Sequence, residues 1–393
     1  MYDLLSKQYY SPDYEAVYHS RFENICAIHL PVEIHKWPAF YVNLPSFSAK
    51  LETIYRLSKA TELLWDQLPS KAQERYFTKA MFHELQHTNE IEGIHSSRQE
   101  LQTAFDSIKS KKNVRFEGLV RSYNWLFQKQ KITLQSSQDI RNIYDNTLLP
   151  DIDKANAPDG KIFRKGYVGI SNGMQDIHKG ILPEADLIEF IDSALQHLIQ
   201  SNFSLLEIAA FHYLFGYAHP FYDGNGRTMR FLSSLFLGAH LNQLIGLNLS
   251  AAIFSDKNAY YKAFEICNDQ KNRGDLTHFI FYFLNIIERS AKEVFEMLQA
   301  AVKRLTYFEN LLDQQNLPEL EDEIAHLLIQ VSLFSDNGIT IGGIQRHIKK
   351  SYYPAKNALE KLISQFSITS KKQGKEILYR LDLDAFEQAI KNP

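Results

Sequence analysis

The sequence predicts a mainly α-helical protein with one β-hairpin and a small C-terminal domain of different character. Apolar residues recur at helical spacing through most of the 393 residues. One stretch, 160–183, is instead rich in glycine and β-branched residues, as hairpins are. A polar segment ending in Pro318 separates the last part of the chain. With 45% hydrophobic residues the chain can bury more than one core, so two or three domains are expected.

Helical periodicity places the individual elements. Two long helices are expected within 48–95, separated near Pro69, and a third begins at Ser97, where Glu100 completes a capping box. Further helices are expected over 114–128, 137–148, 184–200, 204–217, 257–268 and 276–305. The first 45 residues contain scattered prolines and are expected to be irregular. The predicted parts are an N-terminal helical region over 1–110, a core over 111–305, a linker over 306–320 and a last domain over 321–393.

The segment from His219 to Arg230 carries most of the chemically active side chains. Pro220 disfavours helical backbone at His219, so the preceding helix should end there. Gly224 and Gly226 permit a tight loop, and helical spacing resumes directly afterwards. The first N–H groups of that second helix would face the loop, where they can bind an anion.

Four side chains complete this predicted anion site. Arg227 and Arg230 are three residues apart, so they share a helix face and can both hold phosphate oxygens. Asp223 is an oxygen ligand suited to phosphate-bound Mg²⁺. His219 can act as a general base toward an incoming hydroxyl. The set predicts chemistry on a nucleoside triphosphate; the alternative is an ordinary glycine turn with a surface histidine and solvated arginines.

This segment resembles the signature of the Fic family, HPFxDGNGRxxR, at every fixed position. The resemblance implies a Fic-type helical bundle with a hairpin flap that transfers AMP from ATP to a protein hydroxyl. It implies His219 as the base, Asp223 as the Mg²⁺ ligand and Phe221 as the core anchor of the ATP-binding loop. The implied triphosphate site is Gly224, Asn225, Gly226, Arg227 and Arg230. Gly226 favours AMP transfer, because Doc-type relatives, which phosphorylate their targets, have lysine there.

Two more segments resemble parts of the same family. Tyr260, Tyr261 and Asn268 match residues that line the adenine pocket, although aromatic residues of an amphipathic helix can equally belong to the core. Tyr167, Val168, Gly169 and Ile170 form a predicted short strand of the flap, which would hold the target's backbone by strand addition.

A segment ahead of the core resembles the family's inhibitory motif, (S/T)xxxE(G/N). Thr88 and Glu92 are four residues apart on a helix that should end at Gly93, so they share a face. The resemblance implies that Glu92 pairs with Arg230 and blocks the γ-phosphate. The alternative is a solvated glutamate near a helix C-terminus.

The same helix contains HExxH, the pattern of zinc proteases, as His83, Glu84 and His87. The extended form of the pattern is absent, which leaves a distant carboxylate such as Asp106 as the third ligand. A surface helix with two incidental histidines is the favoured interpretation.

The C-terminal part has the layout of a winged helix. Helices are expected over 321–331, 341–349 and 353–366, followed by paired strands over 367–370 and 377–381. Similar domains are attached to many bacterial Fic proteins. The window 341–380 holds two acidic and nine basic residues, namely Arg346, Lys349, Lys350, Lys356, Lys361, Lys371, Lys372, Lys375 and Arg380, whereas the whole chain has a net charge of −3. This segregation predicts contact with DNA; the alternative is a protein-binding or regulatory domain.

The composition indicates the cellular compartment in which the protein is expected. No stretch has the length of apolar sequence that crosses a bilayer, and residues 1–10 lack a secretory pattern. Cys26 and Cys267 are too few for a disulfide framework, so a cytoplasmic setting is expected. Three functions follow in order: an autoinhibited protein adenylyltransferase, a nucleotide-sensing DNA-binding regulator and a zinc hydrolase. The target protein, the acceptor residue and homo-oligomer formation stay open.

Overall fold

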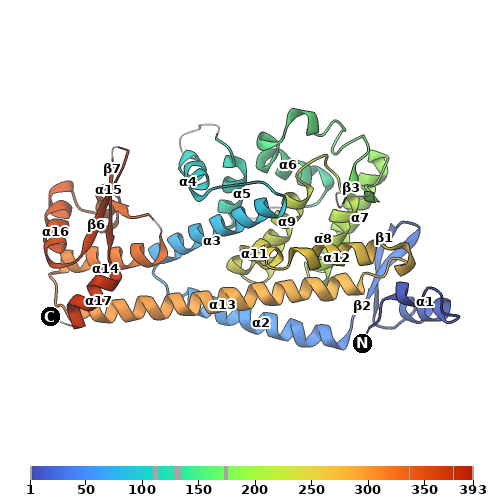
Figure 1. Cartoon of the computed structure of the whole chain (residues 1–393), viewed down its shortest axis with the longest axis horizontal. Coiled ribbons are helices and arrows are strands. Elements are labelled where there is room, and N and C mark those ends of the chain that lie inside the picture. The colour runs from blue at the N-terminus through green and yellow to red at the C-terminus, as the bar shows by residue number, and fades with distance from the viewer. Residues whose placement is uncertain are drawn as a thin grey trace. The chain divides into compact units, whose positions relative to one another are not determined.

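The computed structural model describes residues 2–108, 114–127, 134–171, 176–335, 337–374 and 376–391 (Figure 1). The protein is mainly helical with a few short strands, as predicted. The chain forms two compact units, one from residues 1–59 and 81–294 and the other from 60–80 and 295–393. Three helices have residues in both units: α2 (Pro45–Trp65), α3 (Ser70–Ile91) and α13 (Thr277–Asp313).

The first unit contains most of the predicted helices at or near their expected positions. They are α4 (Arg98–Ser107), α5 (Glu117–Phe127), α6 (Ser137–Thr147), α7 (Glu184–Gln200), α8 (Leu205–Ala218), α9 (Asn225–His240) and α12 (Lys257–Asn268). Helices α1 (Tyr14–Phe22), α10 (Gln243–Gly246) and α11 (Leu249–Phe254) were not predicted. The predicted capping box between Ser97 and Glu100 is present at the start of α4. Every residue of α8 except Gly216 is buried. A helix that is apolar on all sides belongs in a core, and α8 packs between α7 and α9.

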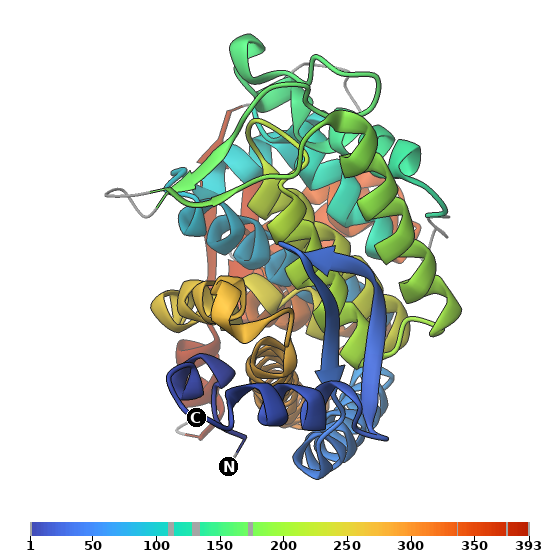
Figure 2. The same cartoon turned by 90° about the vertical axis from the view of Figure 1, so that its right-hand side faces the viewer.

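The N-terminal segment is not irregular, so that expectation was wrong. Strands β1 (Ala27–Ile34) and β2 (Trp37–Val42) form an antiparallel hairpin (blue in Figure 2). Leu30, Val32 and Ile34 alternate with exposed positions, which is the pattern of a strand with one buried face. Pro31 lies where the register shifts, and a two-stranded sheet has only edges, where a residue without an N–H is tolerated.

The predicted flap is a second, shorter hairpin. Strand β3 (Gly169–Ser171) pairs antiparallel with β4 (Asp176–Lys179), with Gly169 opposite Lys179 (green in Figure 2). The expected strand 167–170 therefore begins two residues later, and Tyr167 and Val168 lead into it. The carbonyl of Val168 still accepts a hydrogen bond from the N–H of Gly180.

The second unit contains the predicted helices and strands of the C-terminal part. Its elements are α14 (Glu319–Phe334), β5 (Ile339–Thr340), α15 (Ile341–Ile348), α16 (Tyr352–Gln365), β6 (Ile368–Gln373), β7 (Glu376–Leu381) and α17 (Leu383–Lys391). The strands form one sheet in the order β5-β7-β6. The two-residue strand β5 and the terminal helix α17 were not predicted. Lys375 lies outside the described residues.

The predicted linker over 306–320 is shorter than expected. Helix α13 continues to Asp313 because Phe308, Leu311 and Leu312 extend its buried face beyond Leu305, and α14 begins at Glu319. Only 314–318 connects the two helices.

One carboxylate of α3 lies in the core of the first unit. Glu84 is completely buried and accepts hydrogen bonds from the backbone N–H of Ser250 (2.8 Å) and from the Ser250 and Ser234 hydroxyls. Burial raises the pKa of Glu84 to about 7, because the loss of water outweighs these donors and the charge of Arg230.

This pKa makes stability depend on pH. The carboxyl titrates at about 4.5 when unfolded and about 7 when folded, so the folded state holds the proton more tightly in between. The stabilisation is complete below the unfolded pKa and is lost as pH rises through the folded one. As pH rises from about 4.5 through 7, the free energy of unfolding of the wild type should therefore fall relative to that of Glu84→Gln, by at most on the order of 3 kcal/mol. Thermal unfolding midpoints of both proteins across this window test the prediction, and parallel pH profiles would contradict it.

Candidate functional site

The loop between α8 and α9 has the conformation that its sequence predicts. His219 ends α8 in the left-handed region (φ 51°), and Pro220 follows it. Gly224 (φ 81°) precedes the first residue of α9 and has no side chain to cap it, so the first N–H groups of α9 face the loop. The helix dipole adds partial positive charge at the same place.

Two residues of the signature hold this loop rather than face a ligand. Phe221 is completely buried and its ring stacks on Tyr144, with ring centroids 3.7 Å apart. Asn225 is also buried; it accepts from the N–H of Phe221 (2.8 Å) and donates to its carbonyl (2.7 Å). The ring of Phe221 therefore anchors the loop, and the amide of Asn225 fixes the backbone turn; contact of these two residues with ATP stays a prediction.

Arg227 leaves one strong donor without an acceptor. Its side chain is 2% exposed, and its Nη2 lies 3.4 Å from Oδ1 of Asp223. None of the described residues accepts a hydrogen bond from its Nε. Because a buried guanidinium N–H without an acceptor is unfavourable, an anionic ligand would complete this site. The carboxylate of Asp223 is half-exposed at the loop, where an oxygen ligand for Mg²⁺ is expected.

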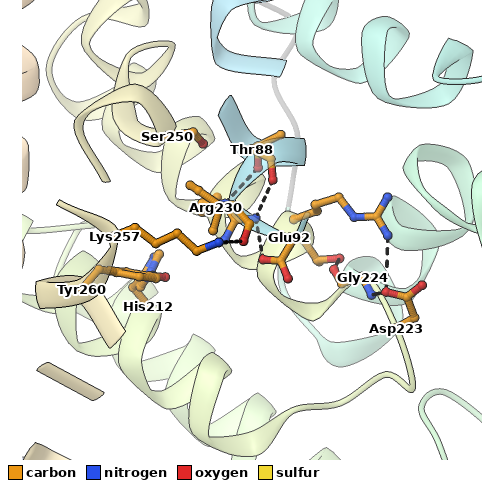
Figure 3. A network of polar contacts seen from close by, with 12 residues as sticks. Thr88, Glu92, His212, Asp223, Gly224, Arg230, Ser250, Lys257 and Tyr260 are labelled. Atoms are coloured by element: carbon orange, nitrogen blue, oxygen red, sulfur yellow. Dashed lines mark hydrogen bonds and ion pairs between the residues drawn. The ribbon is translucent and has the colours of Figure 1, made fainter. Parts of the chain in front are cut away.

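Arg230 is bound by the predicted inhibitory motif (Figure 3). Its side chain is 1% exposed and donates to Oε1 of Glu92 (2.8 Å). It also donates to the hydroxyl and to the carbonyl of Thr88, each at 2.9 Å. A Cβ added to Gly226 would lie 2.0 Å from Oε1 of Glu92. The carboxylate thus lies directly against the first turn of α9, and a side chain at position 226 would displace it.

The ion pair is charged at neutral pH. Burial raises the pKa of Glu92, but Arg230, with smaller contributions from Arg227 and His219, outweighs burial and leaves it below the usual value. Glu92 nevertheless keeps 31% of its side chain exposed. Gly93 (φ 73°) follows α3, and Lys257 of α12 donates to the carbonyl of Ile91 in the last turn of that helix.

The zinc-protease interpretation is not supported by the positions of its residues. Glu84, the required base, is buried against Ser250, whereas His83 is exposed and His87 packs on Phe254. Asp106 accepts a hydrogen bond from Gln102 on its own helix. Within the described ranges, no three His, Cys, Asp or Glu residues gather in a way that could hold a metal ion.

The two tyrosines proposed for the adenine pocket point in different directions. Tyr260 is 1% exposed and its hydroxyl is hydrogen-bonded to Nε2 of His212 (2.7 Å), so it belongs to the core. Tyr261 is 42% exposed and can reach a ligand. Consecutive helix positions differ by about 100°, and the edges of the two rings still meet, with centroids 5.4 Å apart. Asn268 ends α12, and its carbonyl is hydrogen-bonded to Nε2 of His35 (2.9 Å).

Sequence reasoning missed Arg164, which connects the flap to the signature loop. This fully buried side chain donates from Nε to the carbonyl of His219 (2.8 Å) and from Nη1 to that of Gly166 (2.8 Å). Its Nη2 donates to the carbonyls of Ile181 and Ala218. The acceptors are backbone atoms from three segments, so no local sequence pattern identifies this role.

The N-terminal segment holds the loop that follows α12. The guanidinium of Arg273 lies over the rings of Tyr14 and Trp37, 4.5 and 4.4 Å from their centroids. Asp275 accepts hydrogen bonds from Tyr2 (2.7 Å) and Arg21 (3.2 Å). The hairpin and α1 therefore support the segment whose other end carries Tyr261 and Asn268.

No helix in the described parts of the chain has the length and apolar character needed to cross a membrane.

Comparison with known proteins identifies a domain of a known family in part of this chain. Residues 134–237 match the model of the Fic/DOC family. A crystal structure of a Fic family protein from Desulfovibrio desulfuricans G20 is 18% identical, aligns over 87% of this chain and 97% of its own, and has a TM-score of 0.52. A Fic domain containing signaling protein from Bacteroides thetaiotaomicron is 15% identical over 63% of this chain and 97% of its own (TM-score 0.45). Fic-1 from C. elegans is 20% identical over 65% of this chain and 75% of its own (TM-score 0.41). Residues 134–237 of this mainly helical protein therefore form a Fic/DOC family domain.

Proposed function

We propose that this protein transfers AMP from ATP to a hydroxyl side chain of a target protein, or of itself, and that Glu92 restrains the reaction. Fic domain proteins generally transfer a nucleoside monophosphate to proteins. The observation that carries the proposal is the Glu92–Arg230 ion pair against the first turn of α9. A carboxylate in that position competes with the phosphate oxygens that the arginine would otherwise bind.

The residues around the loop suit a nucleoside triphosphate. The first N–H groups of α9 and the guanidinium groups of Arg227 and Arg230 would bind its phosphates, and Tyr261 is accessible to its base. Asp223 would hold Mg²⁺, which when bound neutralises phosphate charge. Gly226 adds no side chain beside the phosphates, in keeping with AMP rather than phosphate transfer.

His219 is the proposed general base. It takes the proton from the target's hydroxyl, whose oxygen forms a bond to the α-phosphorus of ATP. The bond to the bridging oxygen breaks, and pyrophosphate leaves with that electron pair. Arg164 fixes the carbonyl of His219 and the start of the flap together. The edge of strand β3 can add a strand of the target beside the base.

Glu92→Gly should increase AMP transfer about 10- to 100-fold, because it removes a charge-assisted hydrogen bond of roughly 1.5–3 kcal/mol from the inhibited state. Labelling of the purified protein with ATP radioactive at the α-phosphate measures the change. Glu90→Gly is the matched control, since it makes the same substitution at an exposed position two residues earlier on α3. Equal labelling of wild type and Glu92→Gly would contradict restraint by Glu92.

His219→Ala in the Glu92→Gly protein should lower labelling by at least about 100-fold while ATP binding survives, because the base acts on the acceptor and not on the phosphates. Labelling and calorimetric titration with ATP measure the two effects. His19→Ala, which changes an exposed histidine of α1, should leave both unchanged. Chelation of Mg²⁺ should also abolish labelling. Persistent labelling of the His219 variant would exclude this residue as the base.

A second candidate function is a nucleotide-sensing regulator that binds DNA through the second unit. Its order of helices and its final β6–β7 hairpin resemble a winged helix, in which the third helix and the wing contact DNA. Lys356 of α16 and Lys371 and Lys372 of β6 are exposed, as a phosphate-binding surface requires. Not every basic residue is available: Lys361 pairs with Glu321 (2.7 Å), and Arg380 donates to a backbone carbonyl.

Replacing both Lys371 and Lys372 with glutamate in the full chain should weaken binding to duplex DNA and reduce its salt dependence by about two phosphate contacts. Fluorescence anisotropy with a labelled duplex at several salt concentrations measures both. Lys7→Glu with Lys36→Glu gives the same charge change at exposed positions of the other unit. Absence of binding by the wild type at low ionic strength would reject the DNA-binding function. Nucleotide binding without labelling in Glu92→Gly would favour the regulator over the transferase.

A further inference from the structure

We propose that Glu84 is the positioning residue that holds the inhibitory part of α3 against α9, so that loss of its contacts releases Glu92 from Arg230. The inference rests on the proposed function and concerns the regulation of the same site. Glu84 is buried, belongs to none of the predicted phosphate contacts and is the one residue of the HExxH pattern that faces the core.

The spacing of the contacts places Glu84 in one row with the inhibitory residues. Glu84, Thr88 and Glu92 are spaced four residues apart, so Glu84 and Thr88 share one face of α3. Glu92 directly follows the last residue of the helix and contacts the same arginine as Thr88. Their partners on α9, Ser234 and Arg230, are also four residues apart. The contacts between α3 and α9 therefore repeat every four residues on both helices. The contact of Glu84 with Ser234 lies two helical turns from Glu92.

The burial of the two carboxylates differs. Glu92 keeps 31% of its side chain exposed, whereas Glu84 has no exposed surface. All the donors to Glu84 come from other helices: the backbone N–H and hydroxyl of Ser250 on α11, and the hydroxyl of Ser234 on α9. Removing this carboxylate would leave a buried N–H without an acceptor, which destabilises the docked position of α3. Glu84 thus holds the helix, while Glu92 can leave Arg230 without exposing a core group.

A buried tyrosine faces the same carboxylate. Tyr123 of α5 is completely buried, and after burial the charge of Glu84 is the main factor that raises the pKa of its hydroxyl. Glu84 therefore lies among α5, α9 and α11. The charged group that also acts on it is Arg230. A shift of Glu84 would move both the inhibitory helix and the surroundings of the arginine that binds phosphate.

The test compares Glu84→Ala and Ser250→Ala with wild type, each with and without Glu92→Gly. Labelling with α-labelled ATP should rise on the order of tenfold in each single variant. In the Glu92→Gly background the same substitutions should add nothing, because the restraint has already been removed. A merely structural role would lower labelling in both backgrounds and would overturn the proposal. Ser250→Ala removes one hydroxyl and keeps the backbone donor, so it decides the question if Glu84→Ala does not fold.

A second readout separates this proposal from the proposed function. In His219→Ala protein, Glu84→Ala and Ser250→Ala should each tighten ATP binding severalfold and speed amide exchange over residues 84–92, whether or not the protein transfers AMP. Glu90→Ala, an exposed position of the same helix, should change neither. If Glu92→Gly is never labelled but these shifts occur, the transferase fails and the role of Glu84 stands. If Glu92→Gly is labelled while the Glu84 and Ser250 variants match wild type in both readouts, the role of Glu84 is wrong.

Discussion

The rest of the site depends on how the buried guanidinium of Arg230 is neutralised. The side chain is 1% exposed, and its acceptors are the carboxylate of Glu92 and two oxygens of Thr88. Removing one partner of a buried ion pair costs several kcal/mol, because a charge is left without compensation. In this structure the anion that compensates Arg230 is Glu92. Under the proposed function, Glu92 and a phosphate would be alternative anions for the same arginine, so inhibition and nucleotide binding would depend on each other.

A second buried arginine has the opposite character. Arg164 donates to backbone carbonyls from the signature loop and from both ends of the flap. Backbone acceptors cannot be exchanged for a ligand, so these contacts are permanent parts of the fold. The site thus combines a fixed component, which ties His219 to the flap, with an ion pair in which, under the proposed function, the carboxylate would give way to phosphate. That division suits a protein whose fold persists while its activity is controlled.

Sequence reasoning succeeded where structure is decided locally. Helices α7 and α12 begin and end at the predicted residues because their apolar residues keep helical spacing over the whole of each segment. The loop before α9 follows from Pro220 and Gly224. The predictions that failed concern residues whose structure depends on contacts with distant parts of the chain. The β1–β2 hairpin tolerates its prolines through a register shift, and Tyr260 faces inward only because of how α12 packs. Arg164 and Glu84 bind residues far away in the chain, so no local sequence motif could predict these contacts.

The second unit is not one continuous piece of the sequence. Residues 60–80 belong to it although they precede the Fic/DOC domain, and within it Tyr76 of α3 lies against Phe334 of α14, with ring centroids 6.1 Å apart. Recombination at a single joint after the catalytic domain would therefore separate this unit from part of its own core. The second unit could be exchanged intact only if residues 60–80 and 295–393 were exchanged together. Helix α3 consequently contributes its first residues to the second unit and its last residues, which lead to Glu92, to the first.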